Sequence, residues 1–270
     1  MKKIPIRHIS ATVKEPAFTG SFTIRKVGQL LSGKDMVQEL HRHSFFYVLV
    51  LEKGAGEHSI DFTSYPVTNY TVFFMRPGQV HQLMLKKEST GYLMEFSPDF
   101  YSPSRVAANA AGSGKLMPIL NTIFQEYSDK QERYLDVIKS SLDIFFIELL
   151  RALPQHPSKG VSEYTQQRLE ELLAQIEHHN PANKQVSYYA EKLHLTTYQL
   201  NAITKASLGK TCSEVINDHV ILEAKRHLLA TSSQINQIAW QLGYEDVSYF
   251  IRFFKKHTGY SPEAFRHNFT

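Results

Sequence analysis

Residues 239–259 are AWQLGYEDVSYFIRFFKKHTG, and residues 190–209 are AEKLHLTTYQLNAITKASLG. Each stretch has a short apolar segment, a polar turn and a second apolar-faced segment with basic residues. The anchor residues recur at a constant offset (250 − 200, 253 − 203, 255 − 205 and 259 − 209 all equal 50). This order is typical of a helix-turn-helix. We therefore predict two such units, at about 186–210 and 234–258, and interpret the chain as a DNA-binding protein.

The rest of the C-terminal half is predicted to be helical. Helical apolar spacing extends over Thr165–His178, and Cys212–Ala230 is predicted to be one helix that connects the two units. Pro154, Pro157, Ser158, Gly160 and Ser162 indicate a linker, which we place at residues 158–164. The predicted organisation is a 1–157 domain, this linker, and an all-α DNA-binding domain at 165–270.

Short strands fill the N-terminal half. Apolar and aromatic runs bounded by turn residues predict an all-β sandwich or barrel. The predicted strands are Glu39–Leu51, Glu57–Phe62, Tyr70–Met75, Val80–Leu85 and Tyr92–Phe96. A small-residue connection, 102–114, follows them.

A pair of helices is predicted at about 115–153. The second helix has apolar residues with gaps of 3, 4, 3 and 4, which is the spacing of a coiled-coil seam. These residues are Leu135, Ile138, Leu142, Phe145 and Leu149. Two interpretations stay open: the stripe forms a dimer contact, or it packs on the β domain.

The composition is that of an ordinary globular protein of 270 residues, with 42% hydrophobic and 21% charged residues. Cys212 is the one cysteine, which excludes an intramolecular disulfide and a cysteine-paired zinc site. No apolar run is long enough to span a membrane. We expect a cytoplasmic protein with no membrane partner.

The positive and negative charges of the C-terminal domain nearly cancel. Residues 166–270 contain 11 basic and 10 acidic side chains, so the domain has almost no net positive charge. Affinity for DNA is therefore expected to depend on individually placed contacts.

Ile235–Arg266, INQIAWQLGYEDVSYFIRFFKKHTGYSPEAFR, closely resembles the signature of AraC/XylS-type bacterial transcription regulators. The matching features are Ile238-Ala239, Leu242-Gly243-Tyr244, Ser248-Tyr249-Phe250, Arg252, Phe254-Lys255-Lys256, Gly259, Pro262 and Arg266. The first unit resembles the family more loosely, because Ala202 stands where arginine is common and Thr204 where an aromatic residue is common.

The same resemblance implies a cupin-like β barrel that senses a small molecule in the N-terminal half. The matching residues there are His41-Arg42-His43, Gly54-Ala55-Gly56 and Arg76-Pro77-Gly78-Gln79-Val80-His81. The expected fold is thus an α+β multidomain protein, with a cupin-like barrel and helical pair followed by two helix-turn-helix motifs.

The candidate DNA contacts lie mainly on the second helix of each unit. Arg252 is the expected base contact, since a guanidinium bonds guanine O6 and N7 together. Lys255, Lys256 and Arg266 are better suited to phosphate, and Asp246 or a neighbour is expected to cap the helix. The remaining candidates are Tyr198, Asn201, Lys205, Ser248 and Tyr249, with Asn201 suited to adenine N6 and N7.

Three histidines suggest chemistry in the barrel. His41 and His43 share one face of a strand, and His81 could converge on them as a metal site. Metal-binding cupins usually add a carboxylate soon after the histidine pair; it is missing here, although Glu39, Glu57 or Glu95 could substitute.

We prefer a polar effector pocket in which His43, Tyr47 and His81 form hydrogen bonds and Phe45 or Phe73 supplies apolar contact. A third interpretation is that the histidines fill strand ends without any ligand.

These observations favour an effector-responsive, sequence-specific transcription regulator with no catalytic residues, no cofactor and no bound metal. The expected partners are double-stranded DNA, an unknown small effector, a second copy of the chain and, for an activator, RNA polymerase. The alternative is a metal-dependent cupin enzyme with an appended helical domain.

Overall fold

The computed structural model describes residues 6–7, 21–103, 110–111, 114–152, 162–178 and 183–269. Contacts divide the chain into two compact units, Ile4–Gln155 and His156–Thr270. Most of the predicted linker 158–164 and of the predicted connection 102–114 lies outside the described residues.

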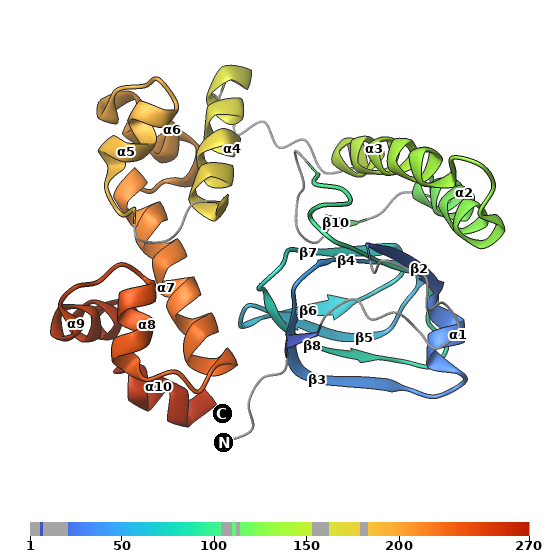
Figure 1. The fold of residues 1–270 in the computed structure, drawn as a ribbon, viewed down its shortest axis with the longest axis horizontal. Coiled ribbons are helices and arrows are strands. Elements are labelled where there is room, and N and C mark those ends of the chain that lie inside the picture. Colours follow the sequence, from blue (N-terminus) through green and yellow to red (C-terminus); the bar gives the residue numbers. More distant parts are fainter. Residues whose placement is uncertain are drawn as a thin grey trace. The chain divides into compact units, whose positions relative to one another are not determined.

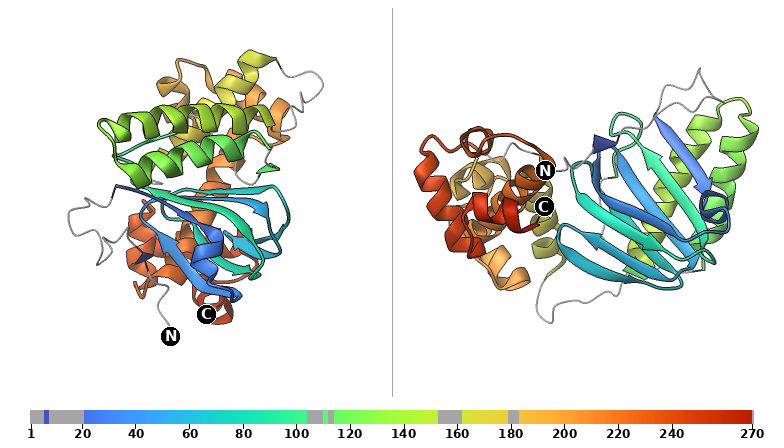
Figure 2. Two further views of the ribbon diagram at one scale, coloured as in Figure 1. Left: turned by 90° about the vertical axis from the view of Figure 1, so that its right-hand side faces the viewer. Right: turned by 90° about the horizontal axis from the view of Figure 1, so that it is seen from below.

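The N-terminal unit contains two five-stranded sheets (Figures 1 and 2). One sheet has the order β1-β3-β8-β5-β6, formed by Ile6–Arg7, Met36–His43, Val80–Leu85, Gly56–Ile60 and Thr63–Val67. The other has the order β10-β7-β4-β9-β2, formed by Ala110–Ala111, Thr71–Met75, Phe46–Lys53, Thr90–Phe96 and Phe22–Lys26. A short helix, α1 (Val27–Leu31), follows β2.

The single strand predicted at Glu39–Leu51 is instead two strands in different sheets. A bend at Ser44 and Phe45 separates β3 from β4. Burial alternates along β3, whereas the first six residues of β4 are all buried. The physical reason is that β3 has one face outside the barrel, while β4 is covered on both faces.

Two apolar cores lie on the two faces of the second sheet. The inner core fills the space between the sheets and includes Leu49, Phe73, Leu83 and Leu93. The outer core lies beneath two helices, α2 (Leu116–Asp129) and α3 (Tyr134–Ala152), which cover that sheet in Figure 1.

The predicted apolar stripe of α3 belongs to the outer core. Ile138, Leu142, Phe145 and Leu149 are buried there, with Leu135 packed against them. Packing on the β domain therefore accounts for this stripe. A dimer contact, if one forms, must use another face of the helix.

The C-terminal unit is helical throughout its described residues. Its helices are α4 (Glu163–His178), α5 (Val186–Lys192), α6 (Thr197–Leu208), α7 (Cys212–Ala230), α8 (Ile235–Gln241), α9 (Val247–Thr258) and α10 (Pro262–Phe269). The connecting helix α7 has the predicted bounds. Figure 1 shows α4, α5 and α6 at one end of α7 and α8, α9 and α10 at the other.

Buried residues along α7, such as Ile216, Ala224 and Leu228, explain why one helix can support both ends of this unit. No helix among the described residues is both long and apolar enough to cross a membrane.

Candidate nucleic-acid interface and effector site

The turns of the two helix-turn-helix units have the same backbone hydrogen bonds. The N–H of Leu195 donates to the carbonyl of Ala190 at 2.8 Å, and the N–H of Tyr244 donates to that of Ala239 at 2.9 Å. A left-handed residue precedes each donor: His194 with φ 54° and Gly243 with φ 72°. The repeated sequence thus folds into a repeated turn.

Caps at both ends of the second helices repeat as well. The Thr196 hydroxyl accepts from the Gln199 N–H and begins α6, while the Asp246 carboxylate accepts from the Ser248 N–H at 2.7 Å and begins α9. The expected cap by Asp246 is therefore confirmed. Left-handed glycines, Gly209 and Gly259, end the two helices.

Helix α9 separates an apolar face from a basic one. Phe250 and Phe254 are fully buried, and Phe253 packs beside the Tyr244 ring. The candidate contacts Ser248, Tyr249, Arg252, Lys255 and Lys256 are all exposed. The Arg252 side chain is 69% exposed and lies 3.8 Å from the Asp246 carboxylate, so it is available to a ligand.

Helix α6 presents a less charged face. Tyr198 is 82% exposed and Lys205 is exposed. The Asn201 side chain already forms two bonds in the unit: its amide N–H donates to the Thr197 carbonyl, and its amide oxygen accepts from the Cys212 N–H. The amide oxygen thus joins α6 to the start of α7, whereas the amide N–H forms a bond within α6.

The Arg266 side chain also forms hydrogen bonds within the unit, which corrects the prediction that it contacts a DNA phosphate. Its guanidinium donates to the carbonyls of Leu228 at 2.9 Å and Ser233 at 2.8 Å. These carbonyls lie at and just after the end of α7, so Arg266 secures the chain between α7 and α8 against α10.

Lys184 is a structural residue that the sequence did not reveal. Its ammonium donates to the Gly243 carbonyl at 2.7 Å and lies 3.9 Å from the centre of the Tyr244 ring. It thereby joins the segment before the first unit to the turn of the second. Burial lowers the pKa of Lys184. No local pattern predicts this contact, because the partners are 59 residues apart.

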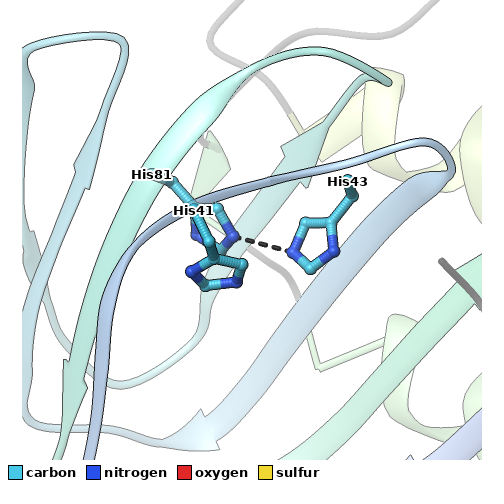
Figure 3. A group of neighbouring side chains, drawn as sticks. All are labelled: His41, His43 and His81. Atoms are coloured by element: carbon cyan, nitrogen blue, oxygen red, sulfur yellow. Dashed lines mark hydrogen bonds between the residues drawn. The ribbon is translucent and has the colours of Figure 1, made fainter. Parts of the chain in front are cut away.

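The histidines of the barrel do converge. His41 and His43 on β3 and His81 on β8 point into the space between the sheets, where all three are less than 5% exposed (Figure 3). The Nε2 atoms of His43 and His81 are 2.8 Å apart, and the Nδ1 atom of His41 lies 2.7 Å from the Glu39 carbonyl. One ligand nitrogen from each ring lies within 4.8 Å of the others.

His58 on β5 is a fourth member that the sequence analysis missed. Its Nε2 atom lies 2.8 Å from the Nδ1 atom of His81, and its ring is fully buried. The signal was available: strand alternation places His58 on the same face as buried Ile60. Strands β3, β8 and β5 are neighbours in one sheet, which brings the four rings together.

Burial keeps these imidazoles neutral. Burial lowers the pKa of His41 from 6.5 to about 4 and the pKa values of His43 and His58 to about 3. The pKa of His81 falls further for the same reason. At neutral pH each ring therefore has one N–H and one lone pair.

Tyr47 of the opposite sheet completes the candidate effector site. Its ring centre is 5.2 Å from that of His43 and 5.4 Å from that of His81. Burial raises the pKa of Tyr47, so its hydroxyl stays protonated. The expected apolar neighbours are present, since Phe45 contacts His43 and Phe73 contacts His58.

The carboxylates considered as a fourth metal ligand lie elsewhere. Glu95 accepts from Thr23 and Arg25, and Glu57 accepts from Ser64. No carboxylate among the described residues joins the three-histidine group. A surface hollow lined by Val37, Gln38, Glu57, Ser59, Gln82 and Met84, among others, lies on the outer face of the same sheet.

Comparison with known proteins matches both units. The model of the AraC-like ligand binding domain matches residues 33–194, more than half of the chain, and a helix-turn-helix domain model matches residues 189–268.

Curated relatives cover most of the chain. The HTH-type transcriptional activator RhaS of Pectobacterium carotovorum is 24% identical over 246 residues, covering 84% of this chain and 87% of that protein. RhaS of Escherichia coli O139:H28 is 25% identical over 245 residues, covering 84% and 86%.

Among solved structures, unsaturated fatty acid bound ToxT of Vibrio cholerae is 16% identical, covers 91% of this chain and 95% of that one, and has a TM-score of 0.42. The C-terminal domain of the response regulator yesN of Fusobacterium nucleatum is 31% identical, covers 37% and 98%, and has a TM-score of 0.35.

The family matches favour a regulator over a cupin enzyme, in agreement with the repeated helix-turn-helix and the cupin-like barrel. The chain belongs to the AraC family of DNA-binding transcription regulators, with a ligand-binding domain followed by a helix-turn-helix domain.

Proposed function

We propose that this regulator binds two successive major-groove segments of one operator, and that the second helix-turn-helix supplies most of the base recognition. The observation that supports this is the exposed basic face of α9. Arg252, Lys255 and Lys256 lie on it at helical spacing, whereas Lys205 is the one basic residue of α6.

The individual roles follow from side-chain chemistry. Arg252 contacts a guanine, because it is exposed and its guanidinium can form two parallel hydrogen bonds to O6 and N7. Lys205, Lys255 and Lys256 contact phosphates, which fixes the register of the protein on the duplex. Tyr198, Ser248 and Tyr249 make shorter-range contacts to the backbone or to thymine methyl groups.

The barrel is proposed to bind a small effector at His43, Tyr47 and His81. These polar groups are surrounded by apolar core residues, and the Nδ1 atom of His43 is buried without a hydrogen-bond partner among the described residues. Buried polar atoms of this kind are usually satisfied by a ligand, an ion or water. An effector regulates DNA binding only if it prefers one of two arrangements of the protein.

A homodimer is proposed to use the outward face of α3, and an activator would also contact RNA polymerase. Val137, Ile144 and Ile147 are 39%, 53% and 48% exposed at spacings of 7 and 3 residues, opposite the buried stripe. Sedimentation equilibrium tests this directly: Ile144→Glu should dissociate the dimer, and an unchanged mass would contradict this assignment.

The experiment that tests the DNA-binding proposal is a fluorescence-anisotropy titration of the full chain. The probe is DNA from upstream of its own gene, with scrambled DNA as competitor, at about 50 and about 200 mM salt. Tight binding that resists the competitor and weakens with salt is the expected result. Binding that the scrambled DNA removes equally well would contradict sequence-specific recognition.

A further inference from the structure

The hydrogen bonds of the histidine cluster fix which nitrogens are available. A carbonyl oxygen only accepts, so the Nδ1 atom of His41 must donate its proton to Glu39, 2.7 Å away. The lone pair of His41 is therefore on Nε2. An imidazole whose other nitrogen donates to a carbonyl has the orientation that metal-binding histidines usually have.

His58 gives His81 a similar arrangement. The Nδ1 atom of His81 has the Nε2 atom of His58 as its partner at 2.8 Å. When His81 donates its Nδ1 proton to His58, its Nε2 lone pair faces His43 and the interior of the cluster. His58 thus serves as the hydrogen-bond acceptor behind a ligand, a position in which carboxylates or carbonyls are more usual.

We propose that His41, His43 and His81 together bind one divalent transition-metal ion of the Zn²⁺ class inside the barrel. The proposal depends on the proposed function in one respect, which is that the barrel interior is the effector site. Imidazole is a preferred ligand of such ions, and three buried rings are brought together by two neighbouring strands.

The ring nitrogens, which all lie within 4.8 Å of one another, must shift to bind one ion. Zinc–nitrogen bonds of about 2.0–2.1 Å at a tetrahedral angle place two ligand nitrogens about 3.3 Å apart. The Nε2 atoms of His43 and His81 are 2.8 Å apart, with a proton between them. The ion takes the place of this proton, which moves to the Nδ1 atom of His43, a buried atom with no partner among the described residues.

Three histidines leave a coordination position open. The ligands are neutral, so a bound ion would place a double positive charge in an apolar interior, which is costly without a counter-charge. No carboxylate among the described residues joins the group to offset this charge. The structure therefore favours hydroxide or a small effector with an anionic oxygen donor.

The test is a metal titration of untagged, chelator-treated full-length protein with Zn²⁺, and with Co²⁺ as its visible-absorbing substitute. We expect one ion per chain and the absorption bands of four-coordinate Co²⁺. His41→Asn and His81→Asn should each abolish stoichiometric binding. His58→Asn should weaken it by about 10- to 100-fold, as loss of a hydrogen-bond partner behind a ligand does.

His194→Asn is the matched control. His194 is an exposed histidine of the C-terminal unit with φ 54°, a conformation that asparagine tolerates, so this variant should bind metal as the wild type does. Circular dichroism in chelator establishes that each variant is folded. The wild-type titration decides the question even if a ligand variant does not fold.

Operator binding, measured on the same samples, separates this proposal from the proposed function. Wild-type protein that binds its operator but not Zn²⁺ or Co²⁺ would overturn the metal site alone. Metal binding that is unchanged in folded His41→Asn and His81→Asn would overturn it equally. Metal binding without operator binding would support the site and contradict the DNA-binding proposal.

Discussion

The two helix-turn-helix units share the geometry of their turns and helix caps but differ in the side chains on the outward faces of their second helices. Their turns share the same hydrogen bonds, their second helices begin with side-chain caps, and both helices end at a left-handed glycine. Their outward faces differ: Ala202 and Ala206 of α6 stand where α9 has Arg252 and Lys256. A turn tolerates little variation, because its backbone geometry is demanding, whereas an exposed face can change without affecting the fold.

This comparison predicts that the units are similar in stability and unequal in DNA recognition. Lys205 of α6 and Lys255 of α9 occupy equivalent positions in the two second helices. We therefore expect a phosphate contact from each unit and a guanine contact from the second unit alone.

Among single substitutions, the largest loss of stability is expected from a change in the core of one unit. Phe250→Ala removes a fully buried ring and should lower the free energy of unfolding by about 3–5 kcal/mol, while the matched Leu200→Ala should cost about 2–5 kcal/mol. Trp240, the one tryptophan, lies on α8, so its fluorescence during urea unfolding reports on the second unit. A Trp240 midpoint unchanged by Phe250→Ala would show that this ring does not hold the unit together.

Acidification should lower the stability of the barrel more than that of the helix-turn-helix units. The pKa values of His41, His43 and His58 fall from 6.5 to about 4, about 3 and about 3 on folding, so the unfolded chain binds more protons below pH 6.5. Barrel stability in chelator should be fully present above pH 6.5. Below it, each histidine should cost about 1.4 kcal/mol per pH unit until its folded-state pKa is reached.

Urea unfolding at several pH values measures this loss: tyrosine circular dichroism follows both units, which share the 14 tyrosines, and Trp240 fluorescence follows the C-terminal unit alone. His58→Asn should reduce the slope by about one proton. The C-terminal unit provides the comparison through Trp240: His194 and His257 are exposed, and burial lowers the pKa of His219 on α7, so this unit should lose less stability than the barrel with its cluster of buried histidines. A barrel whose stability does not change between pH 6.5 and 4.5 (about two units) would contradict the neutral-histidine assignment.

Smaller effects should come from the caps. Thr196→Ala and Asp246→Ala should each lower stability by about 1 kcal/mol, since each leaves an N–H unpaired at the start of a helix. Asp246→Asn keeps the cap but removes the charge that faces Arg252, so it should tighten operator binding slightly at unchanged stability. Thermal unfolding and anisotropy measured together distinguish the two roles. Equal stability losses in Asp246→Ala and Asp246→Asn would argue against the cap.

The smallest expected effect concerns salt dependence. Lys256→Ala should reduce the slope of log affinity against log salt by about one, without changing sequence preference, and Ala206→Lys should restore a comparable amount from the first unit. Titrations at four or more salt concentrations measure the slope. A slope that is the same in wild type and Lys256→Ala would remove Lys256 from the phosphate contacts.

Much of the fold was predictable because its signals are local. The bounds of α7, the cap at Asp246 and the shared face of His41 and His43 follow from apolar periodicity, turn chemistry and strand alternation. The bend at Ser44 and Phe45 that divides β3 from β4 was missed because no glycine or proline marks it and Phe45 is aromatic and buried like the first residues of β4.

The roles of single polar side chains were predicted less well. The sequence pattern predicts that Asn201 and Arg266 are exposed. In the folded unit, however, both side chains form hydrogen bonds with backbone groups that are distant in the sequence. Lys184 shows the same difficulty, because it lies before the first unit while its partner Gly243 lies in the turn of the second unit. Hydrogen bonds between residues far apart in the sequence produce no repeating residue pattern that could predict them.

A base-substitution profile of the operator shows whether Arg252 recognises one particular base pair. Each base pair is replaced in turn, and affinity is measured for wild type, Arg252→Ala and the matched Lys205→Ala. We expect that replacing one G·C pair costs about 1–3 kcal/mol in the wild-type profile, that this penalty disappears in Arg252→Ala, and that Lys205→Ala weakens all sites equally. A profile in which Arg252→Ala weakens every site equally, with all base preferences retained, would contradict it.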